Sequence, residues 1–184
     1  MSKDLNIFQW KDVMRVAIVI AQRITANKEE IDCIVGITRG GMVFATLLAE
    51  LLQKNLYSIS VTRRVNGTEH FDDPRVFNSP NKEAVQNANV LLVDEIIVTG
   101  KTLSLAAESL KSLGANSVKT CAIINRSNGK FESNYIFDFK KTDCTIFPWD
   151  YYILTGTGEV TVHPEYLLID QSLGDDLYVD GGKK

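Results

Sequence analysis

Two adjacent carboxylates and a hydroxyl-rich turn lie close together in the middle of this 184-residue chain. Asp94 and Glu95 follow four apolar residues, and three more apolar residues separate them from Thr-Gly-Lys-Thr at residues 99–102, which opens a predicted helix. Carboxylates at the carboxyl edge of a sheet can accept hydrogen bonds from sugar hydroxyls or bind Mg²⁺. Backbone N–H groups at a helix N-terminus bind phosphate. A sugar phosphate is the ligand that would use both.

Two simpler interpretations compete for this segment. In the first, a threonine caps a helix that follows a strand ending in solvated acids, and no ligand is involved. In the second, Gly-Lys-Thr belongs to a nucleotide-binding P-loop, whose pattern G-x-x-x-x-G-K-T requires a first glycine at position 95. That position holds Glu95, so the P-loop interpretation fails.

A second glycine-containing segment, residues 36–42, reads Gly-Ile-Thr-Arg-Gly-Gly-Met and joins a buried apolar run to a predicted helix. Gly40 and Gly41 allow the backbone to approach an anion closely, and Arg39 supplies a fixed positive charge. Taken alone, Arg-Gly-Gly would better fit a plain turn.

The stretch Val90–Leu103 resembles the phosphoribosyl-diphosphate (PRPP) signature of type I phosphoribosyltransferases, which is an apolar strand, two acids, three residues and then Thr-Gly-x-Thr. The resemblance implies that Asp94 and Glu95 are the catalytic pair that holds the ribose hydroxyls and Mg²⁺, and that the 5′-phosphate lies in the loop that follows. It also implies that the diphosphate lies against the Arg-Gly-Gly segment, with a cis peptide before Arg39. The residues that the resemblance assigns to PRPP are Thr38, Arg39, Gly40, Gly41, Asp94, Glu95, Val98, Thr99, Gly100, Lys101 and Thr102.

Two aromatic segments resemble the xanthine/hypoxanthine-guanine branch of that family: Phe-Pro-Trp-Asp at residues 147–150 and the Trp-containing opening at residues 8–12. That branch carries a Pro-Trp-acid run beside the base pocket. For Trp149, a hydrophobic lid residue without ligand contact is an equal alternative. The base contacts that the resemblance implies are Val98, Arg126, Cys144, Thr145, Ile146, Trp149 and Asp150.

Three base-side positions depart from the pattern of purine enzymes. Val98 stands where many 6-oxopurine enzymes have an Asp that hydrogen-bonds base N7 and manages its proton, and valine cannot exchange a proton. Cys144 replaces an aromatic residue that stacks on the base, and Arg126 is the counterpart of a Lys that donates to the 6-oxo group. The residues assigned to PRPP match the family pattern fully. These departures therefore leave the identity of the base open but do not argue against the use of PRPP.

Two basic residues and a long polar segment complete the candidate site. Arg63 and Arg64 end a predicted strand at the same sheet edge as the motifs, so they could reach a diphosphate; a solvated basic pair is the alternative. Residues 65–88 are polar and irregular, which predicts a long loop or a small excursion of the chain. Such a loop would suit a mobile cover, because an oxocarbenium-like centre at the ribose must be kept from water.

Strands alternate with helices along the chain. Short apolar runs predict strands at residues 32–37, 56–62, 90–93 and 117–124, with short strands at 135–139 and 145–147, while helical spacing predicts helices at 10–26, 42–52 and 102–113. This order predicts an α/β fold with a central, mainly parallel sheet flanked by helices. The resemblance adds a phosphoribosyltransferase domain over residues 1–150, with a small base-binding hood from the N-terminal segment and about 135–150. Residues 151–184 form an extension of unknown role with a flexible end.

Composition narrows the possible partners. The net charge is −3, which argues against a general nucleic-acid binder. No apolar run approaches the roughly 20 residues of a membrane span, and the opening lacks a secretion signal, so we expect a cytoplasmic protein. Cys33 and Cys121 lie in apolar runs and are expected to be buried core residues.

The sequence therefore predicts an enzyme that transfers the phosphoribosyl group of Mg²⁺-PRPP to a nucleobase of the 6-oxopurine type, as in purine salvage. The resemblance implies Mg²⁺ as the cofactor, PRPP and a nucleobase as the substrates, and a homodimer or tetramer. Two alternatives stay open. One is a PRPP- or nucleotide-binding regulatory protein of the same fold, and the other is a phosphoribosyltransferase for a different base.

Overall fold

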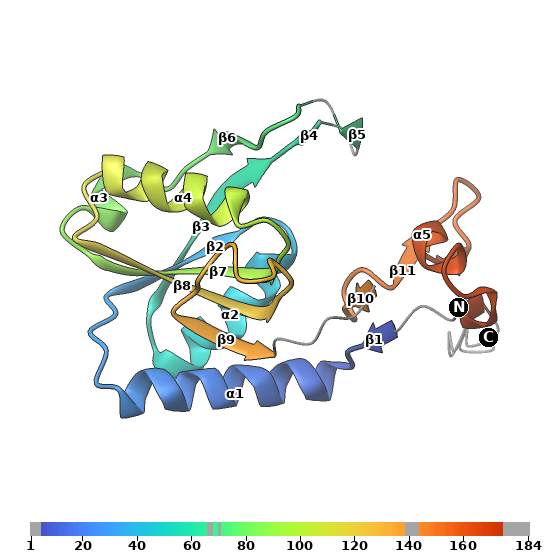
Figure 1. The fold of residues 1–184 in the computed structure, drawn as a ribbon, viewed down its shortest axis with the longest axis horizontal. Coiled ribbons are helices and arrows are strands. Elements are labelled where there is room, and N and C mark those ends of the chain that lie inside the picture. Colours follow the sequence, from blue (N-terminus) through green and yellow to red (C-terminus); the bar gives the residue numbers. More distant parts are fainter. Residues whose placement is uncertain (1–4, 66–67, 70, 139–143, 175–184) are drawn as a thin grey trace. The chain divides into compact units, whose positions relative to one another are not determined.

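The computed structural model describes residues 5–65, 68–69, 71–138 and 144–174 (Figure 1). The chain divides into two compact units. The large unit is Val13–Lys141, and the small unit combines Met1–Asp12 with Thr142–Lys184.

A six-stranded sheet forms the centre of the large unit. Its strand order is β6-β3-β2-β7-β8-β9, and all neighbours are parallel except β6, which runs antiparallel to β3. This confirms the expected mainly parallel sheet. The strands are β2 (Cys33–Ile37), β3 (Asn55–Thr62), β6 (Arg75–Asn78), β7 (Asn89–Ile97), β8 (Ser117–Asn125) and β9 (Tyr135–Asp138).

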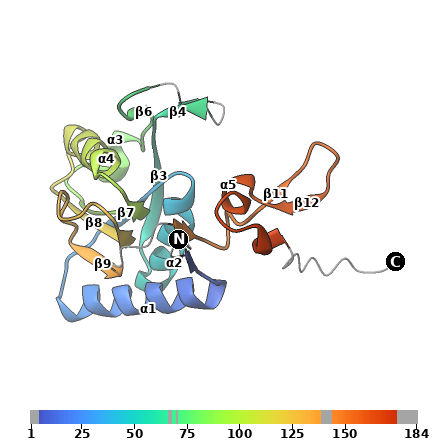
Figure 2. The same cartoon turned by 45° about the vertical axis from the view of Figure 1, so that its right-hand side comes forward.

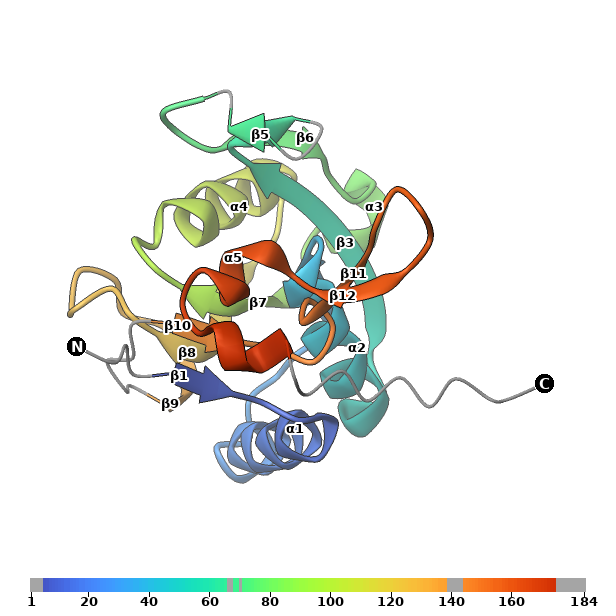
Figure 3. The same cartoon turned by 90° about the vertical axis from the view of Figure 1, so that its right-hand side faces the viewer.

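Helices cover both faces of this sheet. The views agree that α3 (Lys82–Val85) and α4 (Lys101–Ser112) lie over one face, and α1 (Trp10–Ala26) and α2 (Gly40–Leu52) over the other (Figures 1, 2 and 3). Every residue of β2 is buried, because helices cover both faces of the sheet. On the α4 side, Val90 and Leu92 of β7 pack with Leu103 and Leu110 in one apolar cluster. No helix among the described residues is long and apolar enough to cross a membrane.

The chain leaves β2 and β7 in opposite directions across the sheet. From β2 it continues through α2 to β3, and from β7 through α4 to β8, although β2 and β7 are neighbours. A crevice opens outside the carboxyl ends of two such strands, and ligands of open α/β sheets bind there. The pairing of β7 with β2 ends at Val93 and Gly36, so Asp94 is the first residue of β7 beyond it.

Two strands differ from the sequence expectation. β7 continues past the apolar run 90–93 to Ile97, because its pairing with β8 extends as far as Ile97 and Asn125. The carboxylates of Asp94 and Glu95 are therefore borne by the strand itself. Residues 135–138, where the hood was expected to begin, form β9, the sixth strand of the main sheet, and the extent of the hood stays a prediction.

The segment between β3 and β7, expected to be a long loop, contains short elements. β4 (Arg64–Val65) and β5 (Thr68–Glu69) pair antiparallel, and β6 and α3 follow before β7 begins. β6 adds to the edge of the main sheet by pairing with β3. Because the segment is polar and all side chains of β6 are exposed, the sequence did not indicate this edge strand.

The small unit has its own short elements. β1 (Leu5–Ile7) pairs parallel with β10 (Cys144–Ile146), β11 (Tyr152–Leu154) pairs antiparallel with β12 (Val160–Val162), and α5 (Pro164–Leu167) and a 3-10 turn, Gln171–Gly174, follow. Ile146, Val162 and Leu173 form its buried cluster. Residues 152–174 therefore pack with β10, and the division into compact units falls before Thr142. The domain boundary expected at residue 150 stays a prediction. The end that was expected to be flexible falls in residues 175–184, outside the described residues.

Candidate functional site

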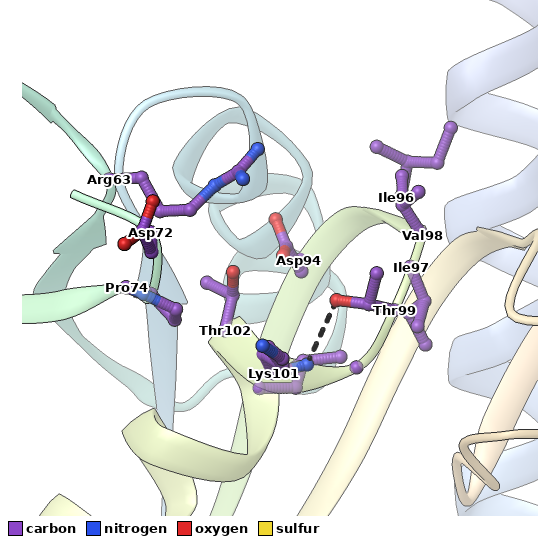
Figure 4. Close-up of a pocket in the computed structure, with 12 residues that line it drawn as sticks. Arg63, Asp72, Pro74, Asp94, Ile96, Ile97, Val98, Thr99, Lys101 and Thr102 are labelled. Atoms are coloured by element: carbon purple, nitrogen blue, oxygen red, sulfur yellow. Dashed lines mark hydrogen bonds between the residues drawn. The ribbon is translucent and has the colours of Figure 1, made fainter. Parts of the chain in front are cut away.

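A cavity of about 300 Å³ lies at the carboxyl end of β7. One wall is the end of β7 together with the first turn of α4, and Arg63 and the Asp72–Pro74 segment supply another part (Figure 4). The cavity is lined by Arg63, Asp72, Pro74, Asp94, Ile96, Ile97, Val98, Thr99, Gly100, Lys101, Thr102 and Leu103. It therefore brings together the acid at the strand end and the whole Thr-Gly-Lys-Thr turn.

The turn that opens α4 is shaped for an anion. Gly100 precedes the helix in the left-handed region with φ +83°, where an L side chain is strained. Its carbonyl oxygen accepts the first helical hydrogen bond from the Ser104 N–H at 2.9 Å, and the Thr99 Oγ1 accepts from the Lys101 N–H at 3.4 Å. The first turn carries no acidic side chain, so the positive end of the helix dipole faces no resident carboxylate on α4.

The acid pair stands next to this turn. Asp94 is buried, at 9% exposure, and its Oδ1 accepts a hydrogen bond from the Glu95 N–H at 2.9 Å. Burial, and next the neighbouring carboxylate of Glu95, raise the pKa of Asp94 well above its usual value. In the protein alone, Asp94 therefore tends to keep a proton that a cation would displace.

The Arg-Gly-Gly segment lies against the acid pair. A Cβ at Gly40 would lie 2.5 Å from the Glu95 carboxyl carbon, and one at Gly41 would lie 2.8 Å from the Asp94 Cα and from the Val93 carbonyl oxygen. Gly41 is thus needed for the close approach of α2 to the backbone of β7, whereas Gly40 leaves room for the side chain of Glu95. Arg39 is exposed just before α2 and does not line the cavity. The peptide between Thr38 and Arg39 is cis, as expected.

The polar segment after β5 reaches the turn at α4. Asp72 and Pro74 line the cavity, and Asp73 forms an ion pair with Lys101. This pairing lowers the pKa of Asp73. Arg63 lines the cavity, whereas Arg64 is not among the lining residues, and contact of either residue with a diphosphate stays a prediction.

Two of the base-side residues lie at the same edge of the large unit. Val98 lines the cavity and is 52% exposed, so it is not a buried packing residue. Arg126 directly follows β8, and its backbone N–H donates to the Ile97 carbonyl oxygen at 2.7 Å. An exposed apolar side chain in a polar cavity fits contact with a flat, partly apolar ligand.

The other base-side residues belong to the small unit. Cys144, Thr145 and Ile146 form β10. The Trp149 ring stacks on Phe147 with centroids 4.8 Å apart and planes at 3°, and Asp150 accepts a hydrogen bond from the Phe147 N–H at 3.0 Å. The ring of Phe147 thus covers one face of Trp149, which is compatible with both interpretations of Trp149. A role for these residues in base binding stays a prediction.

Three residues of this region escaped the sequence analysis: Asp72, Asp73 and Phe131. Asp72 and Asp73 directly precede Pro74, but the whole segment is polar, so this pair of acids did not stand out in the sequence. Phe131 lies in the loop after β8, and no sequence pattern connects it with the turn at Gly100. Its ring nevertheless occupies the space that a side chain at Gly100 would fill.

The donor set at the strand end fits Mg²⁺. Asp94 and Glu95 offer adjacent carboxylate oxygens, and Gly40 leaves room for the Glu95 carboxyl group. Within the described residues, no group of three or more His, Cys, Asp or Glu side chains could hold a metal ion. Mg²⁺ is commonly held by one or two carboxylates together with substrate phosphates. The pair therefore suits an ion that arrives with a phosphorylated ligand.

Comparison with known families and sequences gives consistent results. A family model described as "Phosphoribosyl transferase domain" matches residues 5–155. The hypoxanthine/guanine phosphoribosyltransferase of Methanobrevibacter ruminantium is 30% identical over 118 residues, which cover 61% of this chain and 61% of that protein. The transcriptional regulator GfcR of Methanococcus maripaludis strain C5 is 32% identical over 98 residues, which cover 53% of this chain and 46% of that protein. Other relatives are adenine and orotate phosphoribosyltransferases.

The match does not extend over the full length of these curated relatives, of which the chain spans roughly half. Among solved structures, the purine phosphoribosyltransferase of Pyrococcus horikoshii Ot3 superimposes with a TM-score of 0.68 at 24% identity, over 83% of this chain and 98% of that one. At this identity the likeness establishes a shared fold.

Proposed function

The chain belongs to the phosphoribosyl transferase domain family, and from this membership we propose that it transfers the phosphoribosyl group of Mg²⁺-bound PRPP to a nucleobase of the 6-oxopurine type. The products are a nucleoside monophosphate and diphosphate, as in purine salvage. The proposal includes a cytoplasmic location and assembly as a homodimer or tetramer.

One observation carries the proposal: a buried acid and an anion-binding turn share a cavity at the point where the chain leaves β2 and β7 in opposite directions. A ribose 5-phosphate needs acceptors for its hydroxyl groups and, close beside them, backbone N–H groups that bind its phosphate. In the proposed complex, Asp94 and Glu95 hold the ribose hydroxyls, and the backbone of residues 98–102 holds the 5′-phosphate. PRPP also carries a diphosphate, and binding of this group is the role proposed for Arg39.

The diphosphate end of PRPP is assigned to the Arg-Gly-Gly segment and Arg63. Arg39 is exposed before a helix whose first turn lacks acids, so its guanidinium is accessible to a multiply charged leaving group. Arg63 already lines the cavity. Asp94 and Glu95 would hold Mg²⁺ that arrives with PRPP, and this ion would supply positive charge beside the diphosphate.

The chemical step is a displacement at the ribose anomeric carbon. The bond from this carbon to the diphosphate oxygen breaks, a bond to a base nitrogen forms, and the proton of that nitrogen is released. The chain contributes positioning, charge complementarity and exclusion of water. Val98 cannot accept the base proton, so no side chain at this position acts as a general base.

A second candidate function is a binding protein that senses PRPP or a nucleotide. Relatives that are transcriptional regulators favour it, and Val98 is compatible with it because binding needs no proton transfer. Relatives acting on adenine or orotate favour a third possibility, transfer to a different base. The sensor would bind PRPP without turnover, and the two kinds of transferase would differ in the base that they accept. One assay therefore separates the three candidates.

The assay measures diphosphate release from Mg²⁺-PRPP with hypoxanthine, guanine, xanthine, adenine, uracil and orotate in separate reactions. The proposal expects release with at least one 6-oxopurine. Release with adenine, uracil or orotate alone would reassign the base. PRPP binding by calorimetry without release on any base would favour the sensor.

A further inference from the structure

The loop after β8 contacts the phosphate-binding turn at Gly100. A Cβ at Gly100 would lie 2.4 Å from Cδ2 and 2.5 Å from Cβ of Phe131. The ring is half-buried and packs against the apolar cluster beneath α4. It therefore packs against the one residue of the turn that adopts a left-handed conformation, and it fills the space that a side chain at that residue would occupy.

Phe131 is itself held by a closed set of hydrogen bonds. Ser127, only 2% exposed, accepts from the Phe131 N–H at 3.2 Å and donates to the Phe131 carbonyl oxygen at 3.2 Å. The Asn125 Nδ2 donates to the same carbonyl at 2.9 Å, and its Oδ1 accepts from the Ser127 N–H at 2.9 Å. Two side chains thus fix both backbone polar groups of Phe131, which is unusual order for a surface loop.

The same loop also contacts the other end of the turn. The Arg126 N–H donates to the carbonyl oxygen of Ile97 at 2.7 Å, and Ile97 directly precedes Val98. Residues 126–131 therefore hold the phosphate-binding turn at its entry, by a backbone hydrogen bond, and at Gly100, by the ring. Between these two points lie Val98 and Thr99, whose side chains line the cavity.

We propose that Phe131 is a positioning residue that holds the turn at residues 98–102 in its phosphate-binding conformation, with Ser127 and Asn125 as its anchors. The inference rests on the proposed binding of the PRPP 5′-phosphate by this turn. Without the ring, Gly100 samples its many other backbone conformations, and only a fraction of molecules is ready to bind. If that fraction falls to one tenth, the apparent Kd for PRPP rises about tenfold.

The test compares Phe131→Ala with the unmodified protein by calorimetry with Mg²⁺-PRPP, by steady-state kinetics and by hydrogen exchange of a peptide covering residues 96–103. We expect the Kd and KM for PRPP to rise about tenfold and exchange of this peptide to accelerate. A PRPP affinity equal to that of the unmodified protein would overturn the proposal.

Tyr57→Ala is the matched control, because Tyr57 packs against the same apolar cluster and does not line the cavity. All measurements are made well below the melting temperature of each variant. An equal loss of PRPP affinity in Tyr57→Ala would show that general loosening of the core is responsible, and would also overturn the proposal. If Phe131→Ala does not fold, Phe131→Leu and Ser127→Ala are measured in its place with the same expectations.

Failure of the proposed function is recognised separately. If the unmodified protein does not bind PRPP, the assignment of the turn to its 5′-phosphate fails, and hydrogen exchange alone then decides the role of Phe131. Faster exchange over residues 96–103 in Phe131→Ala, but not in Tyr57→Ala, supports the positioning role. Unchanged exchange overturns it.

Discussion

Alanine at Gly40 and alanine at Gly41 are expected to have opposite consequences, although the two residues are neighbours at the start of α2. At Gly41 the added Cβ would lie 2.8 Å from the Asp94 Cα and from the Val93 carbonyl oxygen, both of which are backbone atoms of a buried strand. At Gly40 it would lie 2.5 Å from the Glu95 carboxyl carbon, which is the end of a flexible side chain. The first clash must displace a strand, while the second needs only a rotation of one side chain.

The magnitudes follow from this difference. Alanine favours the helix over glycine by about 0.5–1 kcal/mol at either position, so this gain cancels when the two variants are compared. Overpacking against fixed backbone costs about 1–3 kcal/mol. At about 2–4 °C per kcal/mol for a chain of this size, Gly41→Ala should melt roughly 2–12 °C below Gly40→Ala. In Gly40→Ala, the displaced Glu95 should weaken Mg²⁺-PRPP binding by about 1.5–3 kcal/mol.

Scanning calorimetry measures the first difference, and titration calorimetry with Mg²⁺-PRPP measures the second. The expected pattern is a less stable Gly41→Ala, and a stable Gly40→Ala with weak PRPP binding. Equal melting temperatures for the two variants would refute the argument that α2 approaches β7 too closely for a side chain. Unchanged PRPP affinity in Gly40→Ala would instead remove Glu95 from the PRPP site.

Three further outcomes are expected. Arg39→Ala should weaken PRPP and diphosphate binding by about 1.5–3 kcal/mol and spare nucleoside monophosphate binding in calorimetry; equal weakening of all three would make Arg39 structural. Val98→Asp should raise turnover with hypoxanthine or guanine in steady-state assays, and because Val98 is half-exposed the fold should tolerate it; unchanged kinetics would remove Val98 from the site. At pH 8 a thiol reagent followed by mass spectrometry should modify half-exposed Cys144 before Cys33 and Cys121. Burial raises the pKa of both buried thiols, that of Cys33 to about 11. Cys33 therefore becomes reactive only as the pH rises toward that value. Labelling of Cys33 faster than that of Cys144 at pH 8 would contradict the burial of Cys33.

Elements defined by their own residues were predictable from the sequence. The spacing of Val13, Val16, Ala17, Ile20 and Ile24 predicted α1, and all five side chains are buried. Elements defined by a distant partner were not. β7 extends to Ile97 because β8 continues beside it, and the sequence of residues 94–97 alone reads as a strand end. β9 joins the main sheet by pairing with β8, which its own residues do not reveal.

The same distinction applies to the site. The contiguous motif at residues 90–103 predicted the acid pair and the turn beside it, because these groups lie on one strand and the helix that follows. The close approach of Gly41 to Asp94, the ion pair between Asp73 and Lys101 and the ring of Phe131 over Gly100 join residues 28 to 53 positions apart. Such contacts depend on the path of whole loops, for which no local pattern exists.

The use of PRPP by this protein is tested by titration calorimetry of Mg²⁺-PRPP with the unmodified protein and with the double variant Asp94→Asn, Glu95→Gln. The expected result is binding by the unmodified protein and none by the double variant, with both giving the same circular dichroism spectrum, because the amides remove the negative charge that the cation requires while keeping the shape of the side chains. Equal PRPP affinity in the two proteins would contradict it.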